Sequence, residues 1–191
     1  MKFHNISFAT TSFNKNLKLR QLAAKRFGKF DTFTQFTDND IDSKFKYKHR
    51  DIWSCRGYGY WIWKPYFILK TLNSLPDGDF VFYSDAGSVM LDNIQPVYDI
   101  MQKLDLRFAA FATPLIEENW TKAELFTYQG QRFKDFKHCN QALGSFHSII
   151  NSVEARRFYQ EFLQLCEEPE LINDTVGPQS EFFIDHRHDQ S

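Results

Sequence analysis

Asp85 is the residue whose type and position could most directly carry chemistry. It follows DFVFYS at 79–84, an almost wholly apolar run that is typical of a strand buried on both faces of a parallel sheet. In an open α/β sheet, ligands bind outside the carboxyl ends of such strands. A carboxylate there suits a divalent metal ion or a ribose hydroxyl. Position alone does not separate these roles from capping of the turn before Gly87.

A glycine- and aromatic-rich segment, RGYGYWIWK at 56–64, precedes that strand. Lys64 stands where a helix is expected to begin, and there it could neutralise a phosphate beside the positive end of the helix dipole. Trp61 and Tyr60 could present flat faces to a sugar ring. The alternative is an exposed Lys64 beside tryptophans that pack under the sheet edge, and for Trp63 packing is the better interpretation. The spacing matches neither a P-loop nor a dinucleotide-binding fingerprint.

The end of the sequence is the third concentration of reactive side chains. Acids, imidazoles, a guanidinium and an amide crowd together as Glu181, Asp185, His186, Arg187, His188, Asp189 and Gln190. Such groups could serve as metal ligands, a phosphate clamp and a general acid or base. The competing interpretation is a solvated tail, which composition alone favours. Two further polar pairs, Thr121-Lys122 and Asn140-Gln141, are expected at the surface.

Composition excludes several classes of protein. The 191 residues suit one sizeable domain, and a 42% hydrophobic and 25% charged composition is ordinary for a soluble globular chain. A net charge of -1 gives no indication that the protein binds nucleic acid or an anionic membrane by electrostatic attraction. The three cysteines, far apart and without paired spacing, favour neither a zinc site nor a disulfide framework. We expect a soluble cytoplasmic protein, without a signal peptide or a membrane span.

The elements that must position these residues alternate along the chain. Strands are expected at 5–11, 31–36, 79–84, 107–112 and 142–150. Helices are expected around 19–27, from Pro65, over 94–104, near 120–127, after Ser152 and over 179–184, with Leu19, Leu22, Ala23 and Phe27 forming the buried stripe of the first. This order predicts a single α/β domain of Rossmann type, with a mainly parallel twisted sheet, right-handed crossovers and flanking helices.

Two blocks, YWIWKP and YSDAG, give the sequence a resemblance to a known family. It resembles bacterial nucleotide-sugar-dependent glycosyltransferases of the GT-A fold, small cytoplasmic enzymes of capsule, O-antigen and lipooligosaccharide synthesis. The resemblance covers most of the chain, from ISFATTSF through GYGYWIWKPYFILKTL and FVFYSDAG to the closing HRHDQS. It implies a GT-A-like fold and transfer of a sugar from a nucleotide-sugar donor to a glycan acceptor. Members usually continue with a helix, so we expect this chain to be truncated at its C-terminus.

The resemblance also implies residue roles. Asp85 matches the first acid of an Asp-x-Asp motif that binds Mn²⁺ or Mg²⁺ and the donor diphosphate, but the second acid is absent, since the run is Asp-Ala-Gly. Asp189 and Gln190 match an Asp-Gln motif near the transferred sugar and are the catalytic candidates. The remaining assignments are Thr10 and Thr11 for the base and ribose, Trp61, Lys64 and Arg187 for the donor, and His186 or His188 as a distal metal ligand.

Two other functions stay open at this point. The missing second acid motivates a non-catalytic nucleotide- or glycan-binding remnant of such an enzyme. An aromatic-rich nucleic-acid-binding module is disfavoured by a pI near 6.6 and the lack of a basic stripe. The partners expected for the transferase are a nucleotide-sugar donor, a glycan or lipid-linked glycan acceptor and a divalent metal ion. No nucleic acid and no transmembrane segment are expected, and peripheral membrane association is compatible with this set.

Overall fold

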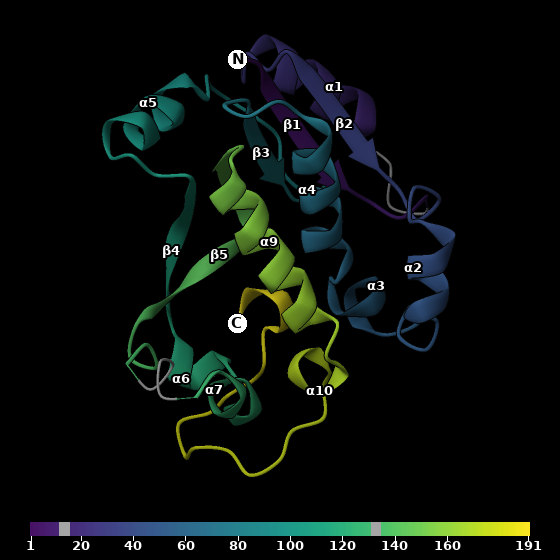
Figure 1. Ribbon diagram of the computed structural model, residues 1–191, viewed down its shortest axis with the longest axis vertical. Coiled ribbons are helices and arrows are strands. Elements are labelled where there is room, and N and C mark those ends of the chain that lie inside the picture. The colour runs from purple at the N-terminus through teal and green to yellow at the C-terminus, as the bar shows by residue number, and fades with distance from the viewer. Residues whose placement is uncertain (12–15, 131–134) are drawn as a thin grey trace.

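An open five-stranded sheet with helices on both faces forms the body of the computed structural model, which describes residues 1–11, 16–130 and 135–191 (Figure 1). The strands lie in the order β2-β1-β3-β5-β4 and comprise β1 Phe3–Phe8, β2 Thr32–Phe36, β3 Phe80–Ser84, β4 Phe108–Ile116 and β5 Asn140–Ile150. The longer helices are α1 Leu17–Arg26, α4 Trp63–Ser74, α5 Gln95–Lys103 and α9 Val153–Cys166. Shorter helices are α2 Ser43–Lys48, α3 Arg56–Tyr60, α6 Glu117–Trp120, α7 Ala123–Gln129, α10 Pro169–Ile172 and η2 His188–Gln190.

The sheet is mixed rather than purely parallel. Strand β1 runs parallel to both β2 and β3, whereas β5 runs antiparallel to both of its neighbours, β3 and β4. Strand β5 is therefore the one that runs against the other four. The predicted α/β class is confirmed. The sheet is not purely parallel because the chain leaves β4 through α6 and α7, and the next strand, β5, pairs antiparallel with β4 itself.

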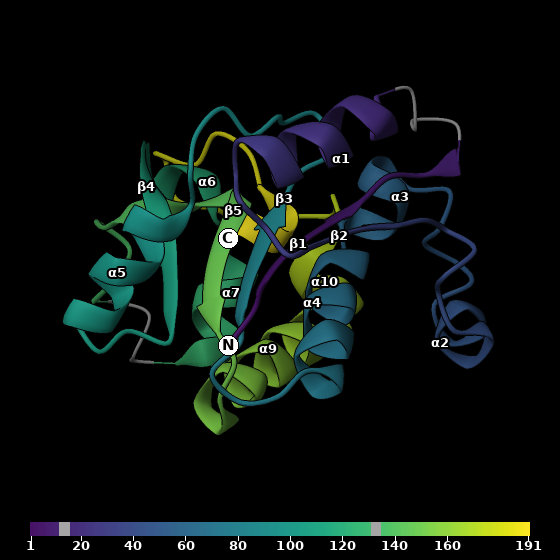
Figure 2. The ribbon, with the colours of Figure 1, turned by 90° about the horizontal axis from the view of Figure 1, so that it is seen from above.

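Strand β3 is buried on both faces, as its apolar sequence predicts. Val81 and Tyr83 belong to the core under α4 and α9, while Phe80 and Phe82 belong to the core under α1 and α5. Alternate residues of a strand point to opposite faces, so a strand covered twice must be apolar throughout. Figure 2 shows α1 on one side of the sheet and α4 and α9 on the other.

The buried side of α1 differs from the predicted stripe. Leu19 and Leu22 are 54% and 58% exposed, whereas Arg20, Ala23 and Ala24 are buried. A buried arginine is stable only when its donors are satisfied. The Arg20 guanidinium meets this condition by bonding to polar atoms of several distant elements, so the helix turns this one arginine inward and two leucines outward.

The segment 179–184 is not the short helix that the sequence predicts. It runs irregularly beside α6, where the Ile184 N–H donates to the Asn119 carbonyl at 2.8 Å and the Asn119 amide donates to the Phe182 carbonyl at 2.7 Å. These long-range bonds replace helical ones. They carry the following residues back toward the sheet rather than out into solvent, where the tail interpretation would have placed them.

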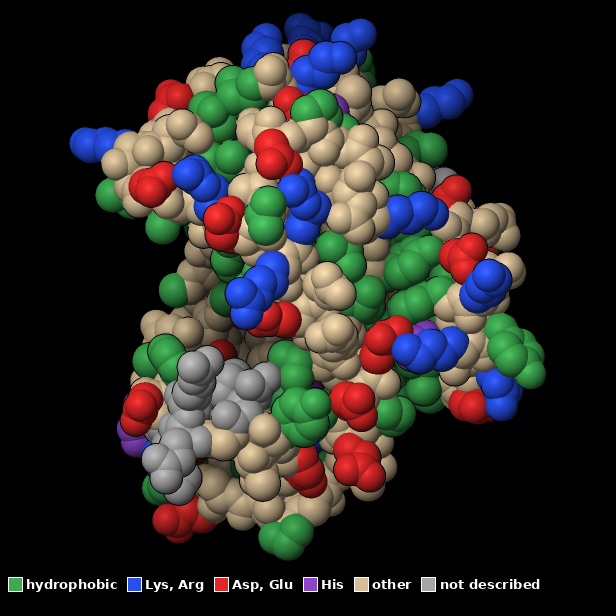
Figure 3. Space-filling model, viewed as in Figure 1, with side chains coloured by type: hydrophobic (Ala, Val, Ile, Leu, Met, Phe, Trp, Pro, Cys, Tyr) green, Lys and Arg blue, Asp and Glu red, His purple; other side chains and the backbone are tan. Residues whose placement is uncertain are grey.

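Within the described residues, no helix combines the length and the apolar character needed to cross a bilayer. Figure 3 shows Lys and Arg side chains beside Asp and Glu side chains across the face that carries α9. This interspersed pattern agrees with the near-zero net charge of -1.

A buried imidazole on β5 makes stability depend on pH. His147 Nδ1 lies 2.8 Å from the Tyr159 hydroxyl oxygen. Burial, together with the nearby positive charge of Lys64, lowers the pKa of His147 from 6.5 to about 3. Between those values the unfolded chain binds the proton and the folded chain does not, so stability falls as pH falls from 6.5. The loss is roughly 1.4 kcal/mol for each pH unit.

We expect His147→Gln to remove this contribution. The amide keeps a partner for the Tyr159 hydroxyl and does not titrate, so the fall in unfolding free energy between pH 6.5 and 4 becomes shallower by roughly 1 kcal/mol or more per pH unit. Urea denaturation of both proteins at pH 7, 6, 5 and 4 measures the two slopes. Equal slopes would mean that His147 titrates normally in the folded state.

Candidate functional site

A polar cleft of about 310 Å³ brings together most of the residues that the sequence singled out. Trp61, Lys64, Asp85, His186, Arg187, His188, Asp189 and Gln190 line it. Asp185, another member of the terminal cluster, also lines it, and Arg56, Trp120, Gly144 and Ser145, which were not predicted, complete the lining. Residues 61–64, 85 and 186–190 lie far apart in the sequence, so their convergence on one cleft is a property of the fold.

The topology explains why these segments meet. Strands β1 and β3 are parallel, and Asp85 follows β3 directly, at the edge where ligands bind in open α/β sheets. Helix α4, which precedes β3 in the chain, begins at the same edge with Trp63 and Lys64. The antiparallel strand β5 enters there with Gly144 and Ser145, and the Asp85 N–H donates to the Ser145 carbonyl at 3.0 Å.

Lys64 and Asp189 form a buried ion pair at the floor of the cleft. The two residues are 3% and 9% exposed, and the Lys64 ammonium contacts the Asp189 carboxylate. Burial raises the pKa of Asp189, and the attraction of Lys64 opposes that rise. The expectation of an exposed Lys64 is therefore wrong. That of a solvated tail is wrong for His186, His188 and Asp189, which are buried, whereas Glu181 and Asp185 are exposed.

Asp85 is held from two sides. The Tyr83 hydroxyl donates to its Oδ1 at 2.5 Å, and burial together with the charge of Asp85 raises the pKa of Tyr83 far above its usual value. The Arg20 guanidinium donates to the Ser88 carbonyl at 3.0 Å and to the Asp85 carbonyl at 3.4 Å. The loop after β3 is thus fixed at both ends, and the Asp85 carboxylate stays at the wall of the cleft.

Arg20 is the main site-forming residue that sequence reasoning missed. Besides the loop carbonyls, it donates to the Ser7 hydroxyl at 2.6 Å and contacts the Gln35 amide. Burial lowers its pKa, and the negative charge of Asp85 opposes that shift. The one available signal was the spacing of Arg20 from Ala23 and Ala24, three and four residues away on the same helix face.

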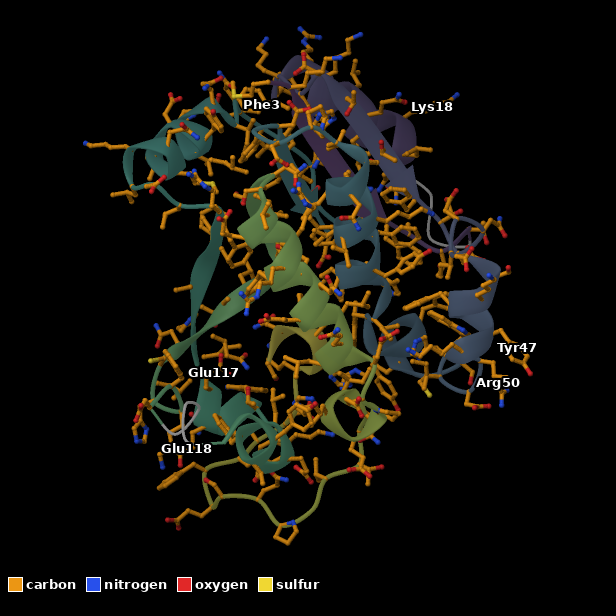
Figure 4. All side chains as sticks on the ribbon, viewed as in Figure 1. Phe3, Lys18, Tyr47, Arg50, Glu117 and Glu118 are labelled. Carbon is orange, nitrogen blue, oxygen red and sulfur yellow. The ribbon has the colours of Figure 1, made fainter. Side chains whose placement is uncertain are left out.

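A polar chain fixes Gln190. Its Oε1 accepts from Arg187 at 3.3 Å, and its Nε2 donates to the Gln141 Oε1 at 3.1 Å. Gln141 donates in turn to Glu117 at 3.1 Å, at the start of α6 (Figure 4). Gln141 is fully buried, as is Lys122, which donates to Asn173 and Thr175. The prediction that these two polar pairs lie at the surface is therefore wrong for Thr121, Lys122 and Gln141.

A left-handed turn places the aromatic side chains beside the cleft. Residues 57–61 have φ values of 64°, 56°, 83°, 54° and 61° in order, and three of them are Tyr58, Tyr60 and Trp61. Each non-glycine residue in this conformation costs roughly 1–2 kcal/mol. The turn brings the Tyr60 and Trp61 rings against the His188 ring, with centroids 5.2 Å away in each case.

Gly57 allows the Trp61 indole to cross this turn. A Cβ at position 57 would lie 2.3 Å from the indole ring, and φ there is +64°. We expect Gly57→Ala to lower the free energy of unfolding by about 1–2 kcal/mol through the backbone alone, with a further loss because the indole must move. Urea denaturation measures the total.

Gly78→Ala is the matched control, since φ is +88° there and a Cβ would meet nothing within 4 Å. Equal losses for the two variants would mean that the Trp61 ring does not press on Gly57.

Trp63 has a structural role, as the sequence favours. Its Nε1 donates to the Gly57 carbonyl at 2.9 Å, and its ring stacks on Phe8 with centroids 4.1 Å apart. Thr10 and Thr11 follow β1 but are not in the lining of the cleft, and the Thr11 N–H donates to the Asp38 carboxylate at 2.9 Å. A base- or ribose-binding role for the two threonines stays a prediction.

His186 and His188 stack on each other, with ring centroids 5.3 Å apart. His186 Nε2 donates to the Leu171 carbonyl at 2.8 Å, and burial lowers its pKa to about 4. His188 Nε2 lies 2.9 Å from Asp174 Oδ1. Protein groups thus already engage both Nε2 atoms. Across residues 1–11, 16–130 and 135–191, no three His, Cys, Asp or Glu side chains are grouped to hold a metal ion.

Comparison with known proteins adds no assignment. No family model matches the sequence, and a search of curated proteins gives no match.

Proposed function

We propose that this chain is a glycosyltransferase of GT-A-like fold that transfers a sugar from a nucleotide-sugar donor to a glycan acceptor. The observation that carries the proposal is the convergence of Asp85, the Lys64–Asp189 pair, Arg187 and Gln190 on one cleft. These are the residues to which the resemblance assigns donor binding and catalysis. The cleft also lies at the carboxyl edge of β3, where α/β sheets bind nucleotides.

The charges of the cleft suit a diphosphate accompanied by a cation. Among the residues that the structure describes, the lining contains three cationic side chains, Arg56, Lys64 and Arg187, against three acids, Asp85, Asp185 and Asp189. A diphosphate therefore enters an approximately balanced site, and a divalent ion would compensate its charge. Mg²⁺ and similar ions are often held by one or two carboxylates, with substrate phosphates and water completing the shell. Asp85 alone can supply that carboxylate, so the missing second acid is not a barrier.

Transfer breaks the bond between the sugar carbon and the diphosphate oxygen and forms a bond from that carbon to an acceptor hydroxyl oxygen. The departing diphosphate gains negative charge and takes up the hydroxyl proton. Arg187 lies in the cleft wall and can stabilise that charge, as preorganised cations do in phosphoryl sites. When bound, the divalent ion supplies further charge stabilisation.

In this proposal Asp189 and Gln190 stabilise the transferred sugar. An oxocarbenium-like sugar is stabilised by a nearby carboxylate or amide oxygen, as in glycoside chemistry generally. The Lys64 contact favours the ionised form of Asp189, and the Arg187 and Gln141 contacts fix the Gln190 amide. The indole of Trp61, in the same lining, offers a flat face to the apolar side of the sugar ring.

Donor turnover tests the proposal. The protein is incubated with UDP-, GDP- and CMP-sugars in the presence of Mn²⁺, and nucleotide release is followed by chromatography. We expect slow release from one donor class without any acceptor, and its loss in Asp189→Asn. Nucleotide binding without turnover of any donor would support the non-catalytic remnant instead.

A further inference from the structure

A second cavity, of about 500 Å³, lies on the other side of the cleft floor. Gly144, Asp189 and Gln190 line both cavities. The second one opens between α9 and β5, on the face that Figure 3 shows, and its wall is mainly aromatic and aliphatic: Phe108, Phe158, Phe162 and Leu165. We name it the apolar pocket.

We propose that the apolar pocket holds the uncharged alkyl or aryl group of an amphiphilic acceptor, with the acceptor hydroxyl at Asp189. This inference rests on the proposed transferase function and specifies its second substrate. The shared wall carries the argument, because ligands that fill the two cavities meet at the candidate catalytic residues.

The wall between the cavities is thin because residue 144 is glycine. A Cβ there would lie 3.4 Å from the Lys64 ammonium nitrogen and 3.4 Å from the Gln190 Cβ, so these two groups approach the backbone of residue 144 to van der Waals contact with the position that a Cβ would take. Asp189 reaches both sides of this wall. A hydroxyl presented from the apolar pocket therefore approaches the residue that the proposal places beside the donor sugar.

The rest of the apolar pocket suits a flat or extended apolar group. The Phe108 and Phe158 rings stack with centroids 4.9 Å apart, and Phe158 is nevertheless 44% exposed. The Phe162 ring stacks on His147 with centroids 6.4 Å apart. Exposed aromatic surface at a pocket mouth is stabilised when a ligand covers it.

The charged residues of the apolar pocket argue for an uncharged occupant. Its charged lining side chains are all acidic: Glu117, Glu161 and Asp189. In the described part of the chain, no Lys or Arg side chain lines it. Glu161 pairs with Arg157 at 2.9 Å and Asp189 pairs with Lys64, so the described side chains offer no unpaired cation to an anionic headgroup, whereas a neutral glycoside with an apolar tail needs none.

A series of alkyl β-glucosides tests the assignment. Binding of methyl, hexyl and octyl β-glucoside, each below its micelle concentration, is measured by titration calorimetry on the full chain. From hexyl to octyl we expect affinity to rise about fourfold per added methylene, the equivalent of ~0.8 kcal/mol each. Affinity independent of chain length would overturn the proposal.

Ala142 offers a matched pair of variants. It lines the apolar pocket from an exposed position on β5, so a larger side chain fills the pocket without entering the core. We expect Ala142→Trp to weaken octyl β-glucoside binding at least tenfold and Ala142→Ser to leave it unchanged. Both variants should melt cooperatively. Equal affinity in Ala142→Trp and the parent protein would place the glucoside elsewhere and refute the pocket.

A nucleotide titration on the same proteins separates this inference from the proposed function. Failure of all nucleotides to bind, with octyl β-glucoside still excluded by Ala142→Trp, would overturn the acceptor role and leave an amphiphile-binding pocket. Nucleotide binding that persists in Ala142→Trp while donor transfer to octyl β-glucoside is lost would support it.

Discussion

Replacing Lys64 with Met is expected to lower the free energy of unfolding by about 3–5 kcal/mol near pH 7, the cost of leaving a buried charge without its partner. Asp189 would then be buried against an uncharged thioether, with Asp85 as another nearby negative charge. Its pKa, already raised by burial, would rise further, and the loss of stability should grow as pH rises above about 4, the unfolded value. Urea denaturation at pH 5 and pH 7 measures this difference.

The double variant Lys64→Met/Asp189→Leu is the control. It removes both charges and leaves apolar groups of similar size, which is often neutral for stability. We expect it to recover most of the lost free energy of unfolding while showing no donor turnover. A loss below about 1 kcal/mol in Lys64→Met would be typical of a solvent-screened surface pair and would contradict a buried one.

Asp85→Asn is expected to lower donor turnover by about 100- to 1,000-fold, the usual effect of removing one preorganised group that stabilises transition-state charge. The amide oxygen still accepts from the Tyr83 hydroxyl, so the loop after β3 should keep its position. The neutral amide holds a divalent ion poorly, so the part of nucleotide binding that needs Mn²⁺ should disappear. Turnover and nucleotide titrations with and without Mn²⁺ measure the two effects.

Asp92→Asn provides a matched control, since Asp92 is an exposed acid beyond the cleft on the same connection. It should change neither turnover nor binding. Full Mn²⁺-dependent nucleotide binding by a folded Asp85→Asn protein would remove Asp85 from the site.

The strand that carries Asp85 could be predicted because local pattern and tertiary environment agree there. An apolar run such as 79–84 is stable only when covered on both sides, and β3 lies at the centre of the sheet with a core on each face. The acid that follows it is then placed at the ligand-binding edge by the fold class alone. Lys64 and Asp189 could each be predicted as a candidate site residue. Their ion pair could not, because no local sequence pattern connects α4 with residues 186–190.

Arg20, Lys122 and Gln141 mark where sequence reasoning fails. Each is buried because its polar atoms bond to groups that are distant in the sequence, such as the Ser88 carbonyl for Arg20 and the Asn173 carbonyl for Lys122. Hydrophobic periodicity assigns charged residues to solvent, and it has no access to such partners. The same periodicity places Leu19 and Leu22 in the core, and that prediction is wrong because both side chains are exposed.

The reversed strand escaped prediction for a related reason. The run 142–150 reads as a strand in either direction, and the choice depends on the path of the described residues that precede it, 117–130 and 135–139. That path is fixed by bonds such as those from the Glu117 N–H to the Cys139 carbonyl and from the Glu118 N–H to the Lys137 carbonyl, at 3.0 and 2.8 Å. Segments with weak periodicity carry little information about such contacts.

Nucleotide binding to the intact chain tests the central claim most directly. Thermal unfolding is followed with UDP, GDP, CDP and CMP, each with and without Mn²⁺, because a ligand of the folded state raises the melting temperature by mass action. The account predicts that one nucleoside diphosphate raises it, that Mn²⁺ increases the shift, and that Asp85→Asn loses the increase. No shift with any of these nucleotides, from a protein that melts cooperatively, would contradict a donor site in the cleft.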